Sequence, residues 1–290
     1  MEQTINSIPK ILHYVWFGPE KPEYLLKNIE SWKKFCPDWE IKEWNEKTFD
    51  LSCNQFAKEA FEDKKWAFVS DYIRLHVLKE YGGVYFDTDV ELFANIDHLL
   101  EKDFFTNFEN DNMVCLAATG ARKQSPIISE FIKLYENRSF FKDKKRKKPD
   151  MTPNVISCSI FFKDRCNVLL NGKTQEKKIF GDNALFLDKR YFFAQDYVTK
   201  KITRTEKCLG IHFYVSSWQG RKERRDDRTV EFFHAILPER FFRFCMRQFL
   251  KLRVIKYRRI FRKLKPELFL VKKNGNKSAK QVAERVSVEG

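Results

Sequence analysis

The sequence lacks a run of 18 apolar residues, and it lacks paired cysteines of the C-x-x-C kind. The first absence predicts no membrane-spanning helix, and the second leaves no pattern for a zinc site or a disulfide framework. Its seven cysteines are irregularly spaced, which favours a reducing compartment. The first residues have no basic segment ahead of an apolar stretch, so we expect no signal peptide and a cytoplasmic location. Because 43% of the 290 residues are hydrophobic, a wholly disordered chain is excluded.

The net charge of +15 is concentrated in one part of the chain. Residues 238–273 contain 13 Lys and Arg against two Glu, whereas residues 1–237 contain 39 basic and 36 acidic residues. A nearly neutral body argues against nucleic acid lying across the whole surface, so we expect no nucleic-acid partner. The basic segment indicates a discrete anionic partner instead.

Apolar residues recur every three or four positions between 242 and 264, and basic residues flank them. This composition is typical of a helix that lies in an anionic membrane interface. We therefore predict a folded domain at 1–237, a basic amphipathic membrane-surface helix at 238–273 and a disordered tail at 274–290. The alternative is a solvated helix that packs its apolar stripe on the body.

Strand and helix patterns alternate within residues 1–237. Apolar or alternating runs predict strands at 11–17, 39–44, 84–86 and 112–118, with further strands near 179, 191 and 211–215. Apolar residues at helical spacing predict helices at 22–35, 55–81 and 126–135. A basic segment at 142–148 predicts a loop, because Pro149 and Pro153 are unfavourable inside a helix. The alternation predicts an α/β fold with a largely parallel sheet and helices on its faces.

Two carboxylates leave the end of the predicted strand 84–86, because Asp87, Thr88 and Asp89 follow it directly. Residues i and i+2 of an extended chain share a face, and paired carboxylates suit Mg²⁺ or Mn²⁺. The tripeptide alone is weak evidence, since most such pairs are solvated turns. Its position strengthens the prediction, because ligands of α/β sheets bind at the carboxyl ends of strands.

The sequence around this pair resembles the DXD-containing sugar-nucleotide glycosyltransferases of family 32. Three blocks carry the resemblance: IPKILHYVWFG at 8–18, SDYIR at 70–74 with YGGVYFDTD at 81–89, and SSW at 216–218. The last block also resembles the element that closes the site in the related glucosylating clostridial toxins. The resemblance implies a glycosyltransferase-A fold, Rossmann-like with a mixed, mostly parallel sheet. It also implies retaining transfer from a nucleotide sugar by a front-face displacement.

The resemblance assigns donor-binding roles to four residues. Trp16 corresponds to the aromatic residue that stacks on the nucleobase, with a core tryptophan as the alternative. Asp71 and Arg74 correspond to donor-sugar contacts, and a local ion pair between them is the alternative. Tyr85 would pack by the ribose or nucleobase, unless it is simply a core tyrosine.

The metal site implied by the resemblance centres on the two aspartates, which are the catalytic residues we predict. Asp87 would contact the ribose and the metal, and Asp89 would ligate the Mn²⁺ or Mg²⁺ ion that bridges the diphosphate. The ion would stabilise charge on the leaving nucleotide diphosphate. His212 is the candidate third metal ligand, although a lone histidine is more often structural.

Residues late in the body complete the predicted site. Trp218 would donate its indole N–H to a phosphate oxygen, and Ser216 or Ser217 would do so through a hydroxyl. Asp182 and Asn183 follow a glycine in a predicted tight turn, and their side chains are weaker candidates for acceptor or sugar contacts. A plain turn is the alternative for them. Asn154 and Ser157, on the segment after Pro153, are weaker candidates still.

We therefore predict a metal-dependent retaining hexosyltransferase. Its donor would be a nucleotide sugar, with a uridine-linked one expected, and its acceptor a lipid-linked glycan. The predicted setting is bacterial surface polysaccharide assembly, of capsule or lipopolysaccharide, on the inner face of the cytoplasmic membrane. Two alternatives stay open: a toxin-like protein glycosyltransferase, and a non-catalytic basic protein that binds membrane or nucleic acid.

Overall fold

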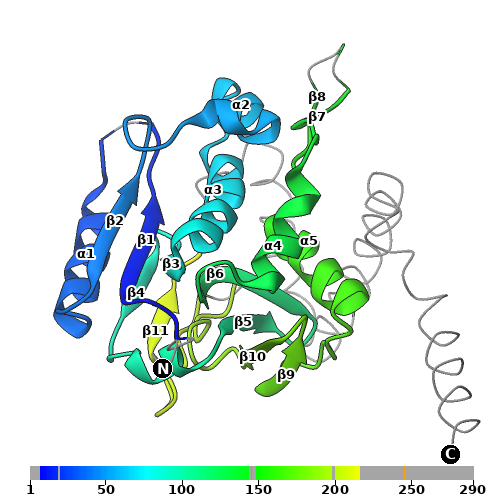
Figure 1. Ribbon diagram of the computed structural model, residues 1–290. Coiled ribbons are helices and arrows are strands. Elements are labelled where there is room, and N and C mark those ends of the chain that lie inside the picture. The colour runs from blue at the N-terminus through cyan, green and yellow to red at the C-terminus, as the bar shows by residue number, and fades with distance from the viewer. Residues whose placement is uncertain are drawn as a thin grey trace, which may run out of the picture.

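The computed structural model of the protein describes residues 7–215, except 19, 144, 146, 147, 198 and 199, together with residue 245. A seven-stranded sheet has the order β2-β1-β3-β6-β5-β10-β9, and two smaller sheets pair β11 with β4 and β7 with β8 (Figure 1). The strands are β1 (Ile11–Val15), β2 (Glu40–Trp44), β3 (Gly83–Phe86), β4 (Val90–Leu92), β5 (Phe104–Asn110), β6 (Met113–Ala121), β7 (Phe141–Asp143), β8 (Lys148–Pro149), β9 (Gln175–Ile179), β10 (Asp182–Leu187) and β11 (Gly210–His212). The helices are α1 (Glu23–Phe35), α2 (Gln55–Glu62), α3 (Trp66–Tyr81), α4 (Pro126–Ile132) and α5 (Asn154–Ile160), with short helical turns η1 (Leu51–Cys53), η2 (Asp97–Glu101), η3 (Lys133–Tyr135) and η4 (Phe161–Arg165).

Most strands of the main sheet point the same way. Strands β1, β2, β3, β5 and β10 run in one direction, and β6 and β9 run in the opposite one. This confirms the predicted α/β fold class, with a mixed, mostly parallel sheet that is flanked by helices. The carboxyl ends of these five strands lie along the same side of the sheet, which we call the carboxyl edge. Helix α2 and the β7–β8 pair lie toward this side (Figure 1).

The sheet separates two hydrophobic cores. Helices α2, α3, α4 and α5 cover one face, and α1, β4 and residues 192–193 cover the other. Strand β3 supplies both cores, because Tyr85 lies in the first, and Val84 and Phe86 lie in the second. An internal strand that is covered on both faces reads as a continuous apolar run, which is why 84–86 was recognisable from sequence. The chain leaving β3 therefore emerges from the middle of the sheet.

The predicted helix 55–81 is two helices, which corrects the sequence prediction. The chain turns between α2 and α3, where Lys64 has a φ of 56° and the N–H of Lys65 donates to the carbonyl of Ala60. A left-handed residue after a helix lets the last carbonyls find donors, and glycine usually takes that place. Since a lysine stands there, the sequence offers no stop signal.

Two further sequence predictions differ from the structure. Strand β5 was not predicted, because a bulge between Phe105 and Asn107 breaks the alternation of its side chains. The strand predicted near 191 is wrong, since the N–H of Tyr191 closes a turn on the carbonyl of Asp188. The predicted strands near 179 and 211–215 correspond to β9 and β11.

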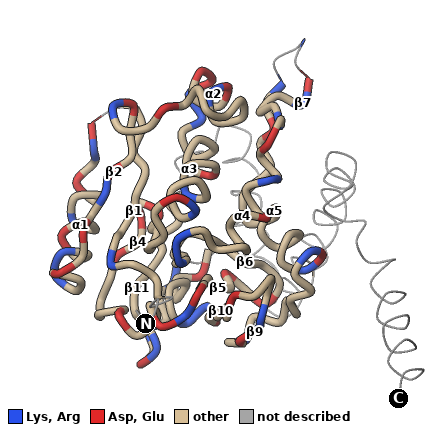
Figure 2. Tube along the Cα trace, in the orientation of Figure 1, with Lys and Arg blue, Asp and Glu red and all other residues tan. Residues whose placement is uncertain are grey.

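Strands β7 and β8, at the two ends of the basic segment 142–148, pair antiparallel and are together called the β7–β8 hairpin. Elsewhere in the described body, basic and acidic residues are interspersed (Figure 2). None of the described helices is long and apolar enough to cross a bilayer. The predicted segments 238–273 and 274–290 lie outside the described residues, apart from Cys245.

Candidate active site

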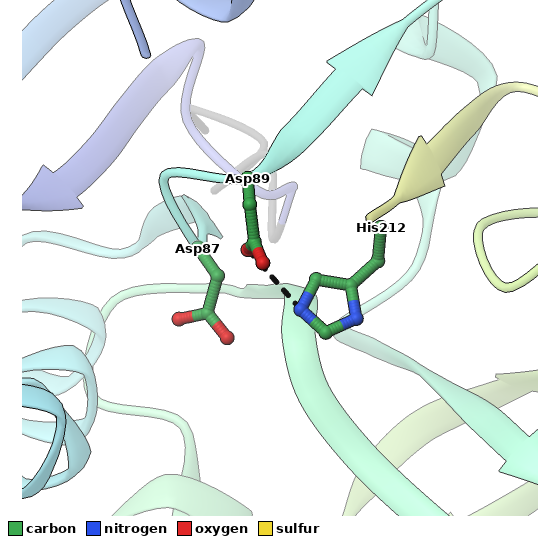
Figure 3. A group of neighbouring side chains, drawn as sticks. All are labelled: Asp87, Asp89 and His212. Atoms are coloured by element: carbon green, nitrogen blue, oxygen red, sulfur yellow. Dashed lines mark ion pairs between the residues drawn. The ribbon is translucent and has the colours of Figure 1, made fainter. Parts of the chain in front are cut away.

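Three potential metal ligands meet at the carboxyl edge. Asp87 follows β3 and Asp89 precedes β4, while the antiparallel pairing of β4 with β11 places His212 opposite Val90. One ligand atom of each of the three lies within 4.8 Å of the other two. Figure 3 shows the two carboxylates and the imidazole converging from these separate segments. The structure thus brings together the predicted metal ligands.

Asp89 is the most firmly held of the three. Its Oδ1 lies 3.1 Å from Nε2 of His212, and its Oδ2 accepts a hydrogen bond of 2.8 Å from the N–H of Val215. Burial opposes the charged carboxylate, but His212 and the Val215 N–H outweigh it, so the pKa of Asp89 is lowered. Burial likewise opposes the charged imidazole of His212, and Asp89 reverses this, so the pKa of His212 is raised.

Asp87 is bound from the other side of the sheet. The hydroxyl of Tyr85 donates a hydrogen bond of 2.9 Å to its Oδ1, and the guanidinium of Arg74 lies 3.1 Å from the same atom. The side chain of Asp87 keeps 23% of its surface exposed, whereas that of Arg74 keeps 6%. Asp87 therefore offers an accessible carboxylate whose orientation is set by buried neighbours.

Arg74 contacts two aspartates: Asp71 on its own helix and Asp87 beyond β3. Its Nη2 lies 3.1 Å from Oδ1 of Asp71 and 3.1 Å from Oδ1 of Asp87, and its guanidinium stacks over the Tyr85 ring at 4.8 Å. Burial raises the pKa of Asp71 to about 7, even though Arg74 opposes this shift. The local ion pair considered from the sequence exists, and the structure extends it to Asp87.

The donor set fits a divalent cation. Carboxylate oxygens suit Mg²⁺ and Mn²⁺, and a neutral imidazole is a common metal ligand in proteins generally. Nδ1 of His212 is buried and has no hydrogen-bond partner among the described residues, so the imidazole is only half satisfied. Asp87, Asp89 and His212 are the residues that would hold Mn²⁺ or Mg²⁺.

Trp16 lies just beyond β1, next to β3 at the carboxyl edge. It is partly buried and packs against the core that contains Trp32 and Phe86. This position is compatible with either a nucleobase contact or a core role. Trp218, Ser216 and Ser217 lie outside the described residues, and their phosphate contacts stay predictions.

Asp182 and Asn183 lie at the opposite end of the sheet, which corrects their predicted place in a turn. They begin β10, and the turn before them is made by Phe180 and Gly181, with φ values of 50° and 99°. Asp182 is fully buried, accepts from Arg122 at 2.7 Å and binds the Ser125 hydroxyl. The structure does not bring this pair to Asp87.

Glu109 near the site was missed in the sequence, and Asn154 was only one of the weaker candidates for acceptor or sugar contacts. Glu109 of β5 has its pKa raised by burial, and its charge acts on His212. Asn154, at the start of α5, hydrogen-bonds the carboxyl group of Asp71. Glu109 escaped notice because β5 was not predicted, and Asn154 stayed a weak candidate because nothing in its local sequence links it to the helix that carries Asp71.

Part of the chain, including most of the candidate site, is similar to a known protein family. Residues 22–106 match the family described as glycosyltransferase sugar-binding region containing DXD motif. The match includes Asp71, Arg74, Tyr85 and the Asp87–Asp89 pair.

Two curated yeast proteins are similar over part of the chain. Inositol phosphoceramide mannosyltransferase 3 of Schizosaccharomyces pombe is 23% identical over 135 residues, which cover 44% of this chain and 37% of that protein. Mannosyl phosphorylinositol ceramide synthase CSH1 of Saccharomyces cerevisiae is 25% identical over 136 residues, which cover 46% and 36%. The chain thus spans little more than a third of the length of these relatives.

Solved structures with some likeness include two glycosyltransferases. One is the PaToxG glycosyltransferase, with a TM-score of 0.40 and 18% identity over 55% of this chain and 73% of that chain. The other takes part in glycosylation of the major capsid of PBCV-1, with a TM-score of 0.38 and 13% identity over 75% and 98%. Residues 22–106 thus match the DXD-containing sugar-binding region of glycosyltransferases, and the family resemblance predicted from the sequence is confirmed.

Proposed function

We propose that the protein is a metal-dependent glycosyltransferase that moves a hexose from a nucleotide sugar to an acceptor. The observation that carries the proposal is the convergence of Asp87, Asp89 and His212 within 4.8 Å, with both aspartates inside the region that matches the DXD family. A non-catalytic binding protein would have no need of such a set of potential ligands. When bound, a divalent ion would supply Lewis-acid stabilisation of the leaving diphosphate.

The residues around the ligands would bind and orient the donor. Arg74 holds Asp87 in place through an ion pair, and Tyr85 does so through its hydroxyl. Asp71 and Arg74 form the buried floor next to this carboxylate, where hydroxyl groups of a donor sugar would find both an acceptor and a donor. Trp16 would stack on the nucleobase at the neighbouring strand end. We further propose that transfer proceeds with retention of configuration.

For the acceptor, we propose a lipid-linked glycan. The basic amphipathic pattern at 238–273 supports a peripheral position on an anionic membrane, and the two curated relatives are named for mannosyl transfer to inositol phosphoceramide, a lipid. The same names support mannose among the candidate hexoses. Assembly of capsule or lipopolysaccharide, on the inner face of a bacterial cytoplasmic membrane, is the setting we propose.

A screen of nucleotide sugars with the purified full chain tests this function. Uridine- and guanosine-linked hexoses are incubated with the protein and Mn²⁺ or Mg²⁺, and the released nucleotide diphosphate is measured. We expect hydrolysis of one donor above all others, and its loss when the metal is removed with a chelator. Metal-independent hydrolysis, or none with any donor, would contradict the proposal.

A further inference from the structure

The β7–β8 hairpin is a basic element that the site itself does not use. Its sequence from 142 to 148 contains six Lys and Arg and a single Asp. Lys142 is paired with Asp150 at 2.8 Å, whereas Lys145 and Lys148 are exposed to solvent. Lys145 and Lys148 therefore give the hairpin two solvent-exposed positive charges within a strongly basic segment.

The base of the hairpin is well anchored. Phe140, which precedes β7, is fully buried, with its ring 5.5 Å from that of Phe56 and 5.3 Å from that of Phe68. On the other side of the hairpin, Asp150 binds Arg138 at 2.9 Å. The charges of Lys145 and Lys148 thus belong to a strand pair that is anchored in the body on both sides.

The hairpin leaves the body beside the candidate active site. Arg138, at its base, acts on the charge of Asp71, and Asn154, just after it, hydrogen-bonds Asp71. Figure 1 shows the hairpin extending past α2 and α5 at the end of the molecule toward which β1 points. A surface that touches the hairpin would therefore lie on the carboxyl-edge side of the protein.

We propose that the β7–β8 hairpin docks on an anionic membrane surface and turns the carboxyl edge toward it. A projecting cationic hairpin reaches a planar surface without further contacts from the body, and attraction to anionic lipid grows with each basic residue near it. A nucleic acid would instead need basic surface along the body, where Figure 2 shows both signs interspersed. The link to an acceptor in the membrane rests on the proposed function, but the docking itself does not.

Charge reversal in the hairpin tests the proposal in the full chain. The double variant Lys145→Glu with Lys148→Glu is compared with the wild type by sedimentation with vesicles of phosphatidylcholine, with and without phosphatidylglycerol. We expect anionic vesicles to bind the variant at least about tenfold more weakly, and the neutralised pair Lys145→Gln with Lys148→Gln to fall in between. Raising the salt concentration should reduce the difference, because exposed charges are screened.

The matched control makes the same charge change at the other end of the sheet. Lys123→Glu with Lys178→Glu alters two exposed lysines there, and it should weaken vesicle binding far less. Equal weakening by both pairs, or none by the hairpin pair, would overturn the proposal. Binding of single-stranded RNA that depends on the hairpin, without vesicle binding, would overturn it in favour of a nucleic-acid partner.

Donor hydrolysis in solution separates this inference from the proposed function. The hairpin variant should hydrolyse the soluble donor as fast as the wild type does, while losing activity on a lipid-linked acceptor in anionic vesicles. If the wild type hydrolyses no donor, the proposed function fails, and the vesicle comparison still decides the role of the hairpin.

Discussion

The side chains of Asp89 and His212 lie 3.1 Å apart because two three-residue strands pair in one register. β11 sets His212 opposite Val90, the residue that follows Asp89, and the N–H of Phe213 donates to the carbonyl of Asp89. Backbone pairing between β4 and β11 therefore sets the distance between Asp89 and His212.

Removal of the imidazole should weaken metal use without stopping the reaction. In the His212→Asn variant, two carboxylates remain, so we expect the Mn²⁺ concentration for half-maximal donor hydrolysis to rise about tenfold or more. The His98→Asn variant changes an exposed histidine and should leave this concentration unchanged. An unchanged metal dependence in His212→Asn would make this histidine a structural partner of Asp89.

Arg74 and Arg122 allow a matched comparison, since each lies between two aspartates. Arg74 joins Asp71 to Asp87, and Arg122 joins Asp182 to Asp103 at the opposite end of the sheet. Lysine cannot reproduce the planar fork of arginine, so Arg74→Lys should lower kcat for donor hydrolysis at least about tenfold.

Arg122→Lys should instead lower the melting temperature while donor hydrolysis persists. Both quantities are measured on both variants. A similar loss of kcat in the two variants would mean that the Arg74 network only stabilises the fold.

Replacement of Trp16 should affect donor binding. Trp16→Ala removes the ring that would stack on the nucleobase, so the KM for the donor should rise while kcat changes little. Trp16→Phe keeps an aromatic face and should raise KM less. Steady-state kinetics with the donor from the screen give both values. If KM stays the same in Trp16→Ala, the side chain belongs to the core and not to the site.

The buried imidazole of His13 makes stability depend on pH. Its Nδ1 accepts a hydrogen bond of 3.1 Å from the Trp44 indole, and its Nε2 lies 2.8 Å from the carbonyl of Gly82, to which it donates. The contact at Nδ1 requires the neutral ring, and burial lowers the pKa of His13 from 6.5 to about 4, although the Gly82 carbonyl favours the charged ring. The folded state thus binds fewer protons than the unfolded state between these values.

Stability from His13 should therefore be complete above pH 6.5 and fall as the pH drops toward 4. The full effect is about 3 kcal/mol in the free energy of unfolding. Denaturant titrations across this range measure it, with His13→Gln as the variant that lacks this contribution to the slope. A wild-type slope no steeper than that of His13→Gln would show that protonated His13 is tolerated in the core.

The parts of the fold that the sequence predicted are those with local signals. The strand 84–86 is apolar throughout because both its faces are covered, and Gly82 and Gly83 end the helix before it. The carboxylates of Asp87 and Asp89 were therefore placed correctly at a strand end. His212 was a weaker prediction, because only the pairing of β11 with β4 brings it to Asp89.

The predictions that failed depend on distant pairing. Asp182 was predicted to lie in a turn. In the structure it is the first residue of β10, which pairs with β5, and its buried carboxylate binds Arg122. Glu109 was not considered, because a bulge hides the pattern of β5. Strand pairing and the position of a bulge depend on residues far apart in the sequence, so neither could be predicted from the neighbouring residues.

The most direct test of the central claim is metal-dependent donor hydrolysis by the wild type and by Asp89→Asn. The substitution keeps the shape of the side chain and removes the charge that would bind the cation. Circular dichroism checks that the variant is folded, since Asp89 also accepts from the N–H of Val215. We predict that Mn²⁺ stimulates the wild type and that Asp89→Asn retains less than about a tenth of its turnover, roughly 1.4 kcal/mol in barrier. A folded Asp89→Asn protein that hydrolyses the donor at the wild-type rate would contradict the account.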